Sequence, residues 1–369
     1  MFADTREEQI TIQAKIQVSM SYFFRPNCMK VILVGVFLQV FQVSISQGWA
    51  DVDAAVTAGS ANLGNENVVM IWKAGDTLVY KKESGGFSTK TAVPIASASK
   101  WLTAALVMMF VDEGKINLDD KIGRWVPEFD RQGKAYITVR HCLAHLTGIE
   151  DEGKLLKKLF QRRKFENLED EVNSLASREI RANAGEDFWY GGVGINIAGR
   201  VLEVVSKKKF DALIRQRLLN PLGMRKTSFA NMEGGPVNPS GGAVSTAEDY
   251  MKFLVMLLNK GKHNGVQLLS EKSVEELMRV QAKPSMIRYA PESAKGFGYA
   301  LGSWVLEEGI DRKAKVVASP GLMGTWPMID WCRGYAYLVV AKKLPGEERT
   351  EAHLRIKEAV DGHFESVCR

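Results

Sequence analysis

The sequence predicts an α/β fold in which an antiparallel sheet is flanked by helices and carries an inserted helical region. β-rich runs lie at residues 68–80 and again at 298–340, whereas residues 116–290 are mostly helical with short connectors. Elements in the order sheet, helices, sheet and final helix favour a sheet domain with a helical region inserted into it. The 369 residues are enough for a sizeable core.

The first predicted elements come before residue 116. In order, they are a loose helix at 50–64, strands at 68–72 and 77–80, and an apolar helix at 101–111. The turn-like segment 73–76 joins the two strands, which predicts a β-hairpin. Glu113-Gly114-Lys115 is typical of a helix end, so the apolar helix should stop there.

The later elements return to strand character. They are an amphipathic helix at 249–258, strands at 298–305, 315–318 and 335–340, and a final helix at about 348–364. Period-2 and period-3.6 patterns distinguish the two types. We therefore expect one folded domain over 47–369, with a sheet region at about 47–115 and 291–369 and a helical region at about 116–290.

The N-terminal residues have the pattern of a secretory signal peptide. Met29 and Lys30 precede the apolar stretch Val31–Val43, and small and polar residues follow up to Ala50. A charged start, a short apolar core and small residues near a cleavage point are the three parts of such a peptide. The apolar run is short for a bilayer span and contains two glutamines, so a membrane anchor is the second interpretation.

Processing of this segment sets the expected location. Residues 1–46 would be removed, and the mature chain would begin near Gln47 or Asp51. Met29 is the expected true start, and the alternative is that residues 1–28 are a long leader of the signal peptide. The protein is then periplasmic or secreted, with no stable membrane insertion after processing.

Net charge does not indicate a nucleic-acid partner. The net charge is +6, and the richest basic run, 154–164, alternates with leucine and phenylalanine. That pattern predicts an amphipathic helix with a solvated basic face. The sequence holds neither a zinc-finger spacing nor an RNA-recognition motif, so we expect no nucleic-acid binding.

Several kinds of chemistry are disfavoured because their motifs are absent from the sequence. It contains no G-x-S-x-G, no H-E-x-x-H and no phosphate- or dinucleotide-binding glycine motif. His141 and His145 are spaced like ligands on a helix, but no third ligand lies nearby, which favours a structural role. The four scattered cysteines predict neither a metal knuckle nor a disulfide framework. We expect no metal and no organic cofactor.

The tetrapeptide Ser97-Ala98-Ser99-Lys100 matches S-x-x-K and falls at the start of a predicted helix. A helix N-terminus offers free backbone N–H groups and a positive dipole end to a developing oxyanion. Ser97 and Lys100 are three residues apart and therefore share one helical face. An amine beside the serine hydroxyl helps remove its proton, so Ser97 is the candidate nucleophile. Taken alone, the motif could also be a helix cap and a surface lysine.

Further segments make the motif specific. They are 95–100, 113–120, 137–148, 220–224, 241–249 and 296–299. With these segments in this order, the chain resembles the serine β-lactamase and penicillin-binding-protein superfamily over about residues 50–345. It is most similar to the class C β-lactamase-like branch, which includes family VIII carboxylesterases. The resemblance implies a β-lactamase/transpeptidase-like fold, with Ser97 and Lys100 as catalytic residues.

The resemblance also assigns a second element, a tyrosine followed two residues later by asparagine. Gly185, Phe188 and Tyr190 fit this register, so Tyr190 is the matching tyrosine. In this family it acts as the general base that takes the serine proton and returns it to the leaving group. Gly192 stands where asparagine is usual. The missing amide makes peptide-like and β-lactam substrates less favoured.

The third element of the family is a cation, a hydroxyl residue and glycine on a strand beside the site. Ser319-Pro320-Gly321 occupies that place, followed by Leu322. Gly321 keeps the close approach, and the amides of Ser97 and Leu322 would form the oxyanion hole. Ser319 replaces the cation and Pro320 the hydroxyl, so substrates recognised by a carboxylate lose two expected partners. Gly192, Ser319 and Gly321 are the candidate substrate-binding residues.

These residues predict a serine hydrolase that forms an acyl-enzyme on a small-molecule ester or amide, most simply a carboxylesterase. A β-lactamase or a D-amino-acid peptidase or carboxypeptidase is the alternative enzyme. A catalytically silent, cell-wall-binding relative is the alternative from another class. The presence of Ser97, Lys100 and Tyr190 together argues against the silent relative, which would be free to lose them.

Overall fold

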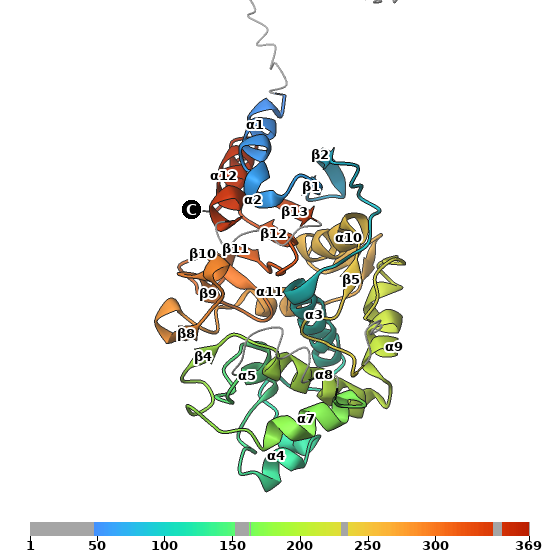
Figure 1. Cartoon of the computed structure of the whole chain (residues 1–369), viewed down its shortest axis with the longest axis vertical. Helices are drawn as coiled ribbons and strands as arrows, with labels where there is room; N and C mark the ends of the chain where they lie inside the picture. Colours follow the sequence, from blue (N-terminus) through green and yellow to red (C-terminus); the bar gives the residue numbers. More distant parts are fainter. Residues whose placement is uncertain (1–47, 152–161, 163, 230–234, 342–348, 369) are drawn as a thin grey trace, which may run out of the picture. The chain divides into compact units, whose positions relative to one another are not determined.

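The computed structural model describes residues 48–151, 162, 164–229, 235–341 and 349–368. Its main feature is a seven-stranded antiparallel sheet with the order β2-β1-β13-β12-β11-β10-β9 (Figure 1). The strands are β1 (Asn67–Lys73), β2 (Thr77–Ser84), β9 (Gly298–Tyr299), β10 (Trp304–Glu308), β11 (Ala314–Ala318), β12 (Trp326–Asp330) and β13 (Tyr335–Ala341). An antiparallel sheet with flanking helices confirms the predicted fold class.

The sheet joins the two ends of the described chain. β1 pairs with β13 along its whole length, with Val69 opposite Val339. Along β13, Tyr335, Tyr337 and Val339 belong to one hydrophobic cluster, whereas Ala336, Leu338 and Val340 belong to another. Successive side chains of a strand point to opposite faces, so both faces of this sheet are covered.

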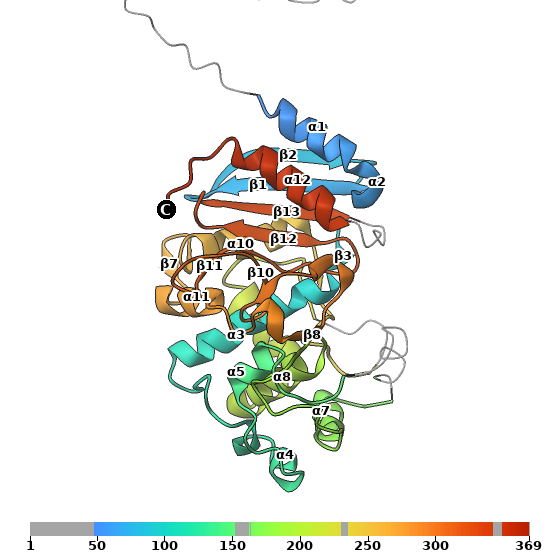
Figure 2. The same cartoon turned by 90° about the vertical axis from the view of Figure 1, so that its left-hand side faces the viewer.

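One face of the sheet is covered by helices from the chain ends. These are α1 (Ala50–Ala58), α2 (Ser60–Leu63) and α12 (Arg349–Asp361). Figure 2 shows α1 and α12 lying along the same face of the sheet. Trp49, just before α1, stacks on His363 with ring centroids 4.1 Å apart. The start of the described chain is therefore part of the fold.

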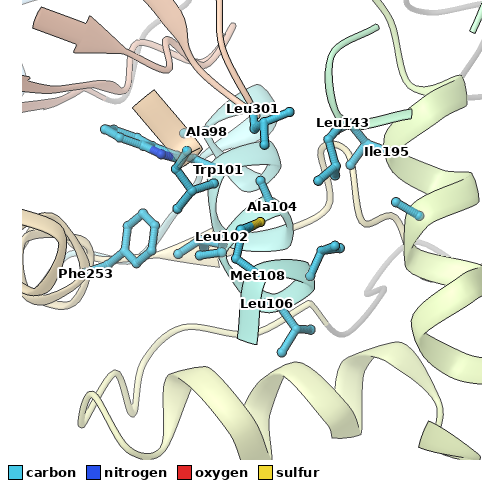
Figure 3. Close-up of a cluster of buried hydrophobic side chains, with 14 of the residues drawn as sticks. Ala98, Trp101, Leu102, Ala104, Leu106, Met108, Leu143, Ile195, Phe253 and Leu301 are labelled. Atoms are coloured by element: carbon cyan, nitrogen blue, oxygen red, sulfur yellow. The ribbon is translucent and has the colours of Figure 1, made fainter. Parts of the chain in front are cut away.

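The opposite face packs on α10 (Ala247–Leu258), which contacts β1, β12 and β13. Beyond it, α3 (Ser99–Asp112) runs through the main hydrophobic core and is almost entirely buried. Figure 3 shows its side chains meeting Leu143, Ile195 and Phe253 from three other helices. A helix that is apolar on all sides must be surrounded by protein. The core thus fixes both ends of α3.

The other elements are short, except the central helix α8. Helices are α4 (Glu128–Arg131), α5 (Val139–Leu143), α7 (Leu168–Ala176), α8 (Val193–Ser206), α9 (Phe210–Ile214) and α11 (Glu271–Met278). Short paired strands are β3 (Val93–Pro94) with β5 (Val244–Ser245), β4 (Phe188–Trp189) with β8 (Ile287–Tyr289), and β6 (Lys262–His263) with β7 (Val266–Gln267). Single turns are η1 (Ala96–Ala98), η2 (Ile122–Arg124), η3 (Arg215–Leu219), η4 (Pro284–Met286) and η5 (Glu292–Ala294).

Two details of the strands differ from the sequence-based expectation. The predicted strand 298–305 is divided into β9 and β10, and β12 was not predicted at all. Gly302 lies at the division with φ 83°, and a Cβ there would stand 2.8 Å from the side chain of Ala104. The strand breaks at Gly302 because its backbone turns against α3, and only glycine adopts this conformation without strain.

The cysteine pattern predicted no disulfide, which is wrong for one pair. Cys332 and Cys368 are bonded, with their Cα atoms 5.1 Å apart. The tail after α12 returns to β12, where the Val367 N–H donates to the Cys332 carbonyl at 2.8 Å. Cysteines 36 residues apart thereby meet, which sequence spacing alone does not reveal. Cys142 is buried and unbonded.

Two predictions concern residues that are mainly outside the described ranges. The predicted signal peptide lies outside them, as does most of the predicted basic helix at 154–164. Among the described residues, no helix combines the length and hydropathy needed to cross a membrane.

Candidate active site

Ser97 lies in η1, at the entry to α3. The preceding residue, Ala96, has φ 44°, in the left-handed region that alanine rarely adopts. Such a conformation costs energy and persists where the surrounding structure enforces it, often at a functional site. Here the turn follows β3, and the Ile95 N–H donates to the Ala243 carbonyl at 2.9 Å. The fold thus holds Ser97 at a sharp bend before a rigid helix.

Lys100 is the immediate partner of Ser97. Its Nζ donates to Ser97 Oγ at 3.2 Å and to the Ser240 carbonyl at 2.7 Å. Lys100 is buried, with only 4% of its surface exposed. The same Nζ lies 4.9 Å from the centre of the Tyr190 ring. The amine is therefore fixed between the nucleophile, a carbonyl and the tyrosine.

Tyr190 follows β4 and is buried among aromatic rings. The rings within 6.5 Å of it, between centroids, are those of His145, Phe188, Tyr299 and Trp304. Burial raises the pKa of Tyr190 to about 12, while its interactions with Ser97 and with the charge of Arg349 act in the opposite direction. Lys100 Nζ contacts both Ser97 Oγ and the Tyr190 ring, which brings the tyrosine into the group that can exchange a proton with the nucleophile.

His145 supports this cluster without being charged. Burial, and then the neighbouring Lys100 charge, hold the pKa of His145 well below its ordinary value. Its Nε2 forms a hydrogen bond with the Tyr299 hydroxyl at 3.1 Å. His141 instead caps α5, accepting the Thr138 N–H at 3.2 Å. The two histidines therefore have separate structural contacts.

Gly321 lies against the backbone that precedes the nucleophile. A Cβ at this position would stand 2.1 Å from the Ile95 carbonyl oxygen, so only glycine fits. The Gly321 N–H donates to the Thr325 carbonyl at 2.7 Å, which closes the turn. Leu322, the next residue, is 41% exposed and thus lies at the surface. This arrangement suits the predicted use of the Ser97 and Leu322 amides as an oxyanion hole.

Ser319 faces away from this surface. Its hydroxyl donates to the Gly302 carbonyl at 3.1 Å, and the residue is buried. Ser319 replaces the family's cation in sequence, but its hydroxyl forms an internal hydrogen bond and does not face the substrate. Pro320 offers neither a hydroxyl nor an N–H.

Gly192 precedes α8, and the space beside it is filled. Its N–H donates to Asp151 Oδ2 at 2.8 Å. A Cβ at residue 192 would stand 2.9 Å from Ser240 Oγ, which is too close. The Ser240 hydroxyl thus approaches the place where a side chain at residue 192 would begin.

Two residues at the site were missed by the sequence analysis, Ser240 and Arg349. The Ser240 carbonyl holds Lys100, as described above. Arg349 begins α12 and is buried; its Nη1 donates to the Gly321 carbonyl at 2.8 Å and its Nη2 to Ser293 Oγ at 3.3 Å. The charge of Arg349 opposes the rise in the pKa of Tyr190 that burial causes. Neither residue belongs to a local motif, because both reach the site through tertiary packing.

The chain is similar in sequence to a known protein family and to a mycobacterial protein. The family model described as Beta-lactamase matches residues 52–361. An uncharacterized protein of Mycobacterium tuberculosis is 28% identical over 329 residues, covering 72% of this chain and 81% of that protein.

Solved structures show a similar fold. A putative beta-lactamase from Bacteroides dorei has a TM-score of 0.74 at 24% identity, covering 85% of this chain and 99% of that one. EstCE1, a hydrolase with promiscuous acyltransferase activity, has a TM-score of 0.71 at 19% identity, with the same coverages. A penicillin-binding protein homologue from Pyrococcus abyssi has a TM-score of 0.70 at 20% identity, covering 86% and 78%.

Proposed function

Because the chain belongs to the beta-lactamase family of serine hydrolases, we propose that it is a carboxylesterase that acts on small neutral esters through an acyl-enzyme at Ser97. The observation that supports this most strongly is the contact of Lys100 Nζ with Ser97 Oγ at 3.2 Å. Tyr190 completes the group, because the centre of its ring lies 4.9 Å from Lys100 Nζ and Ser97 acts on the pKa of its hydroxyl. A nucleophile beside a proton acceptor and a fixed cation is the arrangement that acyl transfer needs.

In the proposed reaction, Tyr190 takes the Ser97 proton while Ser97 Oγ bonds to the ester carbonyl carbon. The oxyanion that forms accepts hydrogen bonds from the backbone N–H groups of Ser97 and Leu322. Collapse of this intermediate breaks the bond to the leaving alcohol, which takes the proton from Tyr190. Water then attacks the acyl-enzyme by the same route, which releases the acid and restores Ser97.

The preference for esters depends on what the site lacks. The Ser319 hydroxyl is engaged with Gly302, and Pro320 has no donor. Gly192 has no side chain to bond a substrate amide. Arg349 is a second cation near the site, but its Nη1 and Nη2 already donate to the Gly321 carbonyl and to Ser293 Oγ. A substrate carboxylate therefore finds weaker recognition here, whereas a neutral ester does not depend on it.

We expect p-nitrophenyl butyrate to be hydrolysed with a higher kcat/KM than nitrocefin. A charge-assisted hydrogen bond to a carboxylate is worth about 1.5–3 kcal/mol. Its loss should lower the efficiency on carboxylate-bearing substrates by about ten- to a hundredfold. Both constants are measured on one preparation. Equal or higher efficiency with nitrocefin would mean that the esterase assignment is wrong.

Residues 192 and 240 should be energetically coupled. Gly192→Asn alone forces a Cβ to within 2.9 Å of Ser240 Oγ, and overpacking costs about 1–3 kcal/mol. Because Lys100 depends on the Ser240 carbonyl, kcat for p-nitrophenyl butyrate should also fall. Adding Ser240→Ala removes the close atom and should recover part of the lost unfolding free energy. Additive effects of the two substitutions in a double-mutant cycle would contradict this packing.

We also propose that the protein is exported. Support comes from the signal-like residues 29–50 and from the Cys332–Cys368 disulfide, a bond that persists mainly in oxidising compartments. Trp49 stacks on His363, so cleavage near Gln47 keeps this contact, whereas cleavage at Asp51 removes it. N-terminal sequencing of the protein from the periplasm or medium should therefore begin near Gln47. A chain that still carries Val31–Val43 would favour a membrane anchor.

A further inference from the structure

An ion pair between Glu171 and Arg162 contacts Ser240 through two asparagines, Asn196 and Asn238. Glu171, on α7, is 5% exposed, and its Oε2 lies 2.8 Å from Nη2 of Arg162. A buried pair is an expensive way to stabilise a fold, because desolvation offsets most of the attraction. The contacts that both residues make with their surroundings therefore indicate what the pair does.

Arg162 forms hydrogen bonds with residues 237 and 238, which directly precede Ser240 in the chain except for Pro239. Its Nη1 donates to Asn238 Oδ1 at 2.8 Å, and its Nη2 donates to the Val237 carbonyl at 2.9 Å. The planar guanidinium makes these bonds in a fixed direction. Asn238 Oδ1 also accepts the Ser240 hydroxyl at 2.9 Å, so the arginine and the serine share one acceptor.

Glu171 reaches the same serine by a second route. Asn196 Nδ2 donates to Glu171 Oε1 at 3.0 Å, and Asn196 Oδ1 accepts the Ser240 N–H at 3.1 Å. Asn196 is buried on α8, one turn after Gly192. The Ser240 N–H is thus held mainly by Asn196, with a longer bond to Asn238 Oδ1 at 3.3 Å, and the Ser240 hydroxyl is held by Asn238.

Ser240 in turn holds the amine beside the nucleophile. Its carbonyl accepts the bond from Lys100 Nζ at 2.7 Å, the shorter of the two hydrogen bonds described for that amine. We propose that Glu171, with its counterion Arg162, is a positioning residue that fixes the Ser240 carbonyl and so keeps Lys100 within reach of Ser97. This inference rests on the proposed function, because it assigns a purpose to Lys100 in acyl transfer.

The expected effect follows from the geometry. Displacements of about 1 Å at a catalytic group lower rates by about a hundredfold, and a smaller movement costs proportionally less. Loss of the support should therefore lower kcat by about ten- to a hundredfold. Because neither Glu171 nor Arg162 contacts the nucleophile, substrate binding should change little, and KM should stay within about threefold.

The test uses two variants and one matched control in the full chain. Glu171→Gln removes the ion pair, and Asn196→Ala removes one branch without leaving a buried charge unpaired. The control is Glu203→Gln, also on α8. Glu203 is 4% exposed, its Oε2 lies 3.2 Å from Arg200 Nη1, and its Oε1 accepts the Phe210 N–H at 2.9 Å, so these contacts do not involve Ser240. Thermal unfolding, kcat and KM for p-nitrophenyl butyrate, and the rate of fluorophosphonate labelling are measured for each.

We expect both variants to lose kcat and labelling rate at least about tenfold relative to Glu203→Gln, with KM nearly constant. If Glu171→Gln does not fold, Asn196→Ala decides the matter alone. Rates within twofold of the control would overturn the positioning role while leaving the esterase proposal intact. If the unmodified protein is itself not labelled, it is the proposed function that fails.

Discussion

Ser97→Ala should reduce the hydrolysis of short p-nitrophenyl esters to the background rate, a loss on the order of 10⁴-fold or more. The hydroxyl of Ser97 receives the Lys100 hydrogen bond at 3.2 Å and supplies the atom that is acylated. Without it, neither Lys100 nor Tyr190 has a nucleophile to activate. Steady-state kinetics on the purified variant, with thermal unfolding to confirm folding, measures the effect.

Ser99→Ala is the matched control for this experiment. Ser99 lies in the same motif and is fully buried, but its hydroxyl accepts the Ala243 N–H at 3.1 Å. Its loss should cost about 1 kcal/mol of unfolding free energy and leave most of the activity. Substantial ester hydrolysis by the Ser97→Ala protein would refute the assignment of the nucleophile.

Tyr190→Phe should lower kcat by about 10²- to 10⁴-fold, the usual contribution of a positioned general base. The phenylalanine keeps the packing among the aromatic rings but has no group that exchanges a proton with Ser97. Tyr299→Phe is the control, since Tyr299 is buried in the same cluster and its hydroxyl bonds to His145. A Tyr190→Phe protein as active as the Tyr299→Phe protein would rule out Tyr190 as the base.

The pH dependence supplies an independent check on Tyr190. Because burial raises the pKa of Tyr190 to about 12, its basic, deprotonated form is scarce at neutral pH and becomes more populated as the pH rises. The kcat/KM of the unmodified protein should therefore increase with pH between about 6 and 9. The Tyr190→Phe protein should lose this increase.

Local sequence patterns predicted the longer helices and strands best. Strand β2 continues to Ser84, four residues beyond its predicted end. Strand β1 and helix α10 agree closely with the expected ranges, because runs rich in β-branched residues and helical periodicity are strong local signals. Helix α3 was predicted from its apolar run for the same reason. Strand β12 was missed, although all five of its residues are buried. Pro327 inside this run and Asp330 at its end are residues that strands disfavour, so the run does not look like a strand in the sequence.

The residues of the candidate site that lie in local motifs were predicted from the sequence, and those that reach the site by tertiary contact were not. Ser97, Lys100, Tyr190 and Gly321 lie in or beside local motifs. Lys100 Nζ contacts both Ser97 Oγ and the Tyr190 ring, and Gly321 packs against the Ile95 carbonyl. Ser319 shares such a motif, yet its hydroxyl turns inward to Gly302.

Contacts between distant segments could not be predicted from local pattern. Ser240 is 140 residues from Lys100, and Arg349 is 28 residues from Gly321. The Cys332–Cys368 bond likewise depends on where the tail returns to the sheet. Such meetings are fixed by tertiary packing, which a single sequence does not encode in any short window.

Peptide mapping after fluorophosphonate labelling tests the acyl-enzyme at Ser97 most directly. The reagent phosphonylates an activated serine hydroxyl, so mass spectrometry of the digested protein identifies the nucleophile without assuming a substrate. We predict one adduct, on the peptide containing Ser97, that is absent from Ser97→Ala. An adduct on a different serine, or no adduct on the folded protein, would contradict this account.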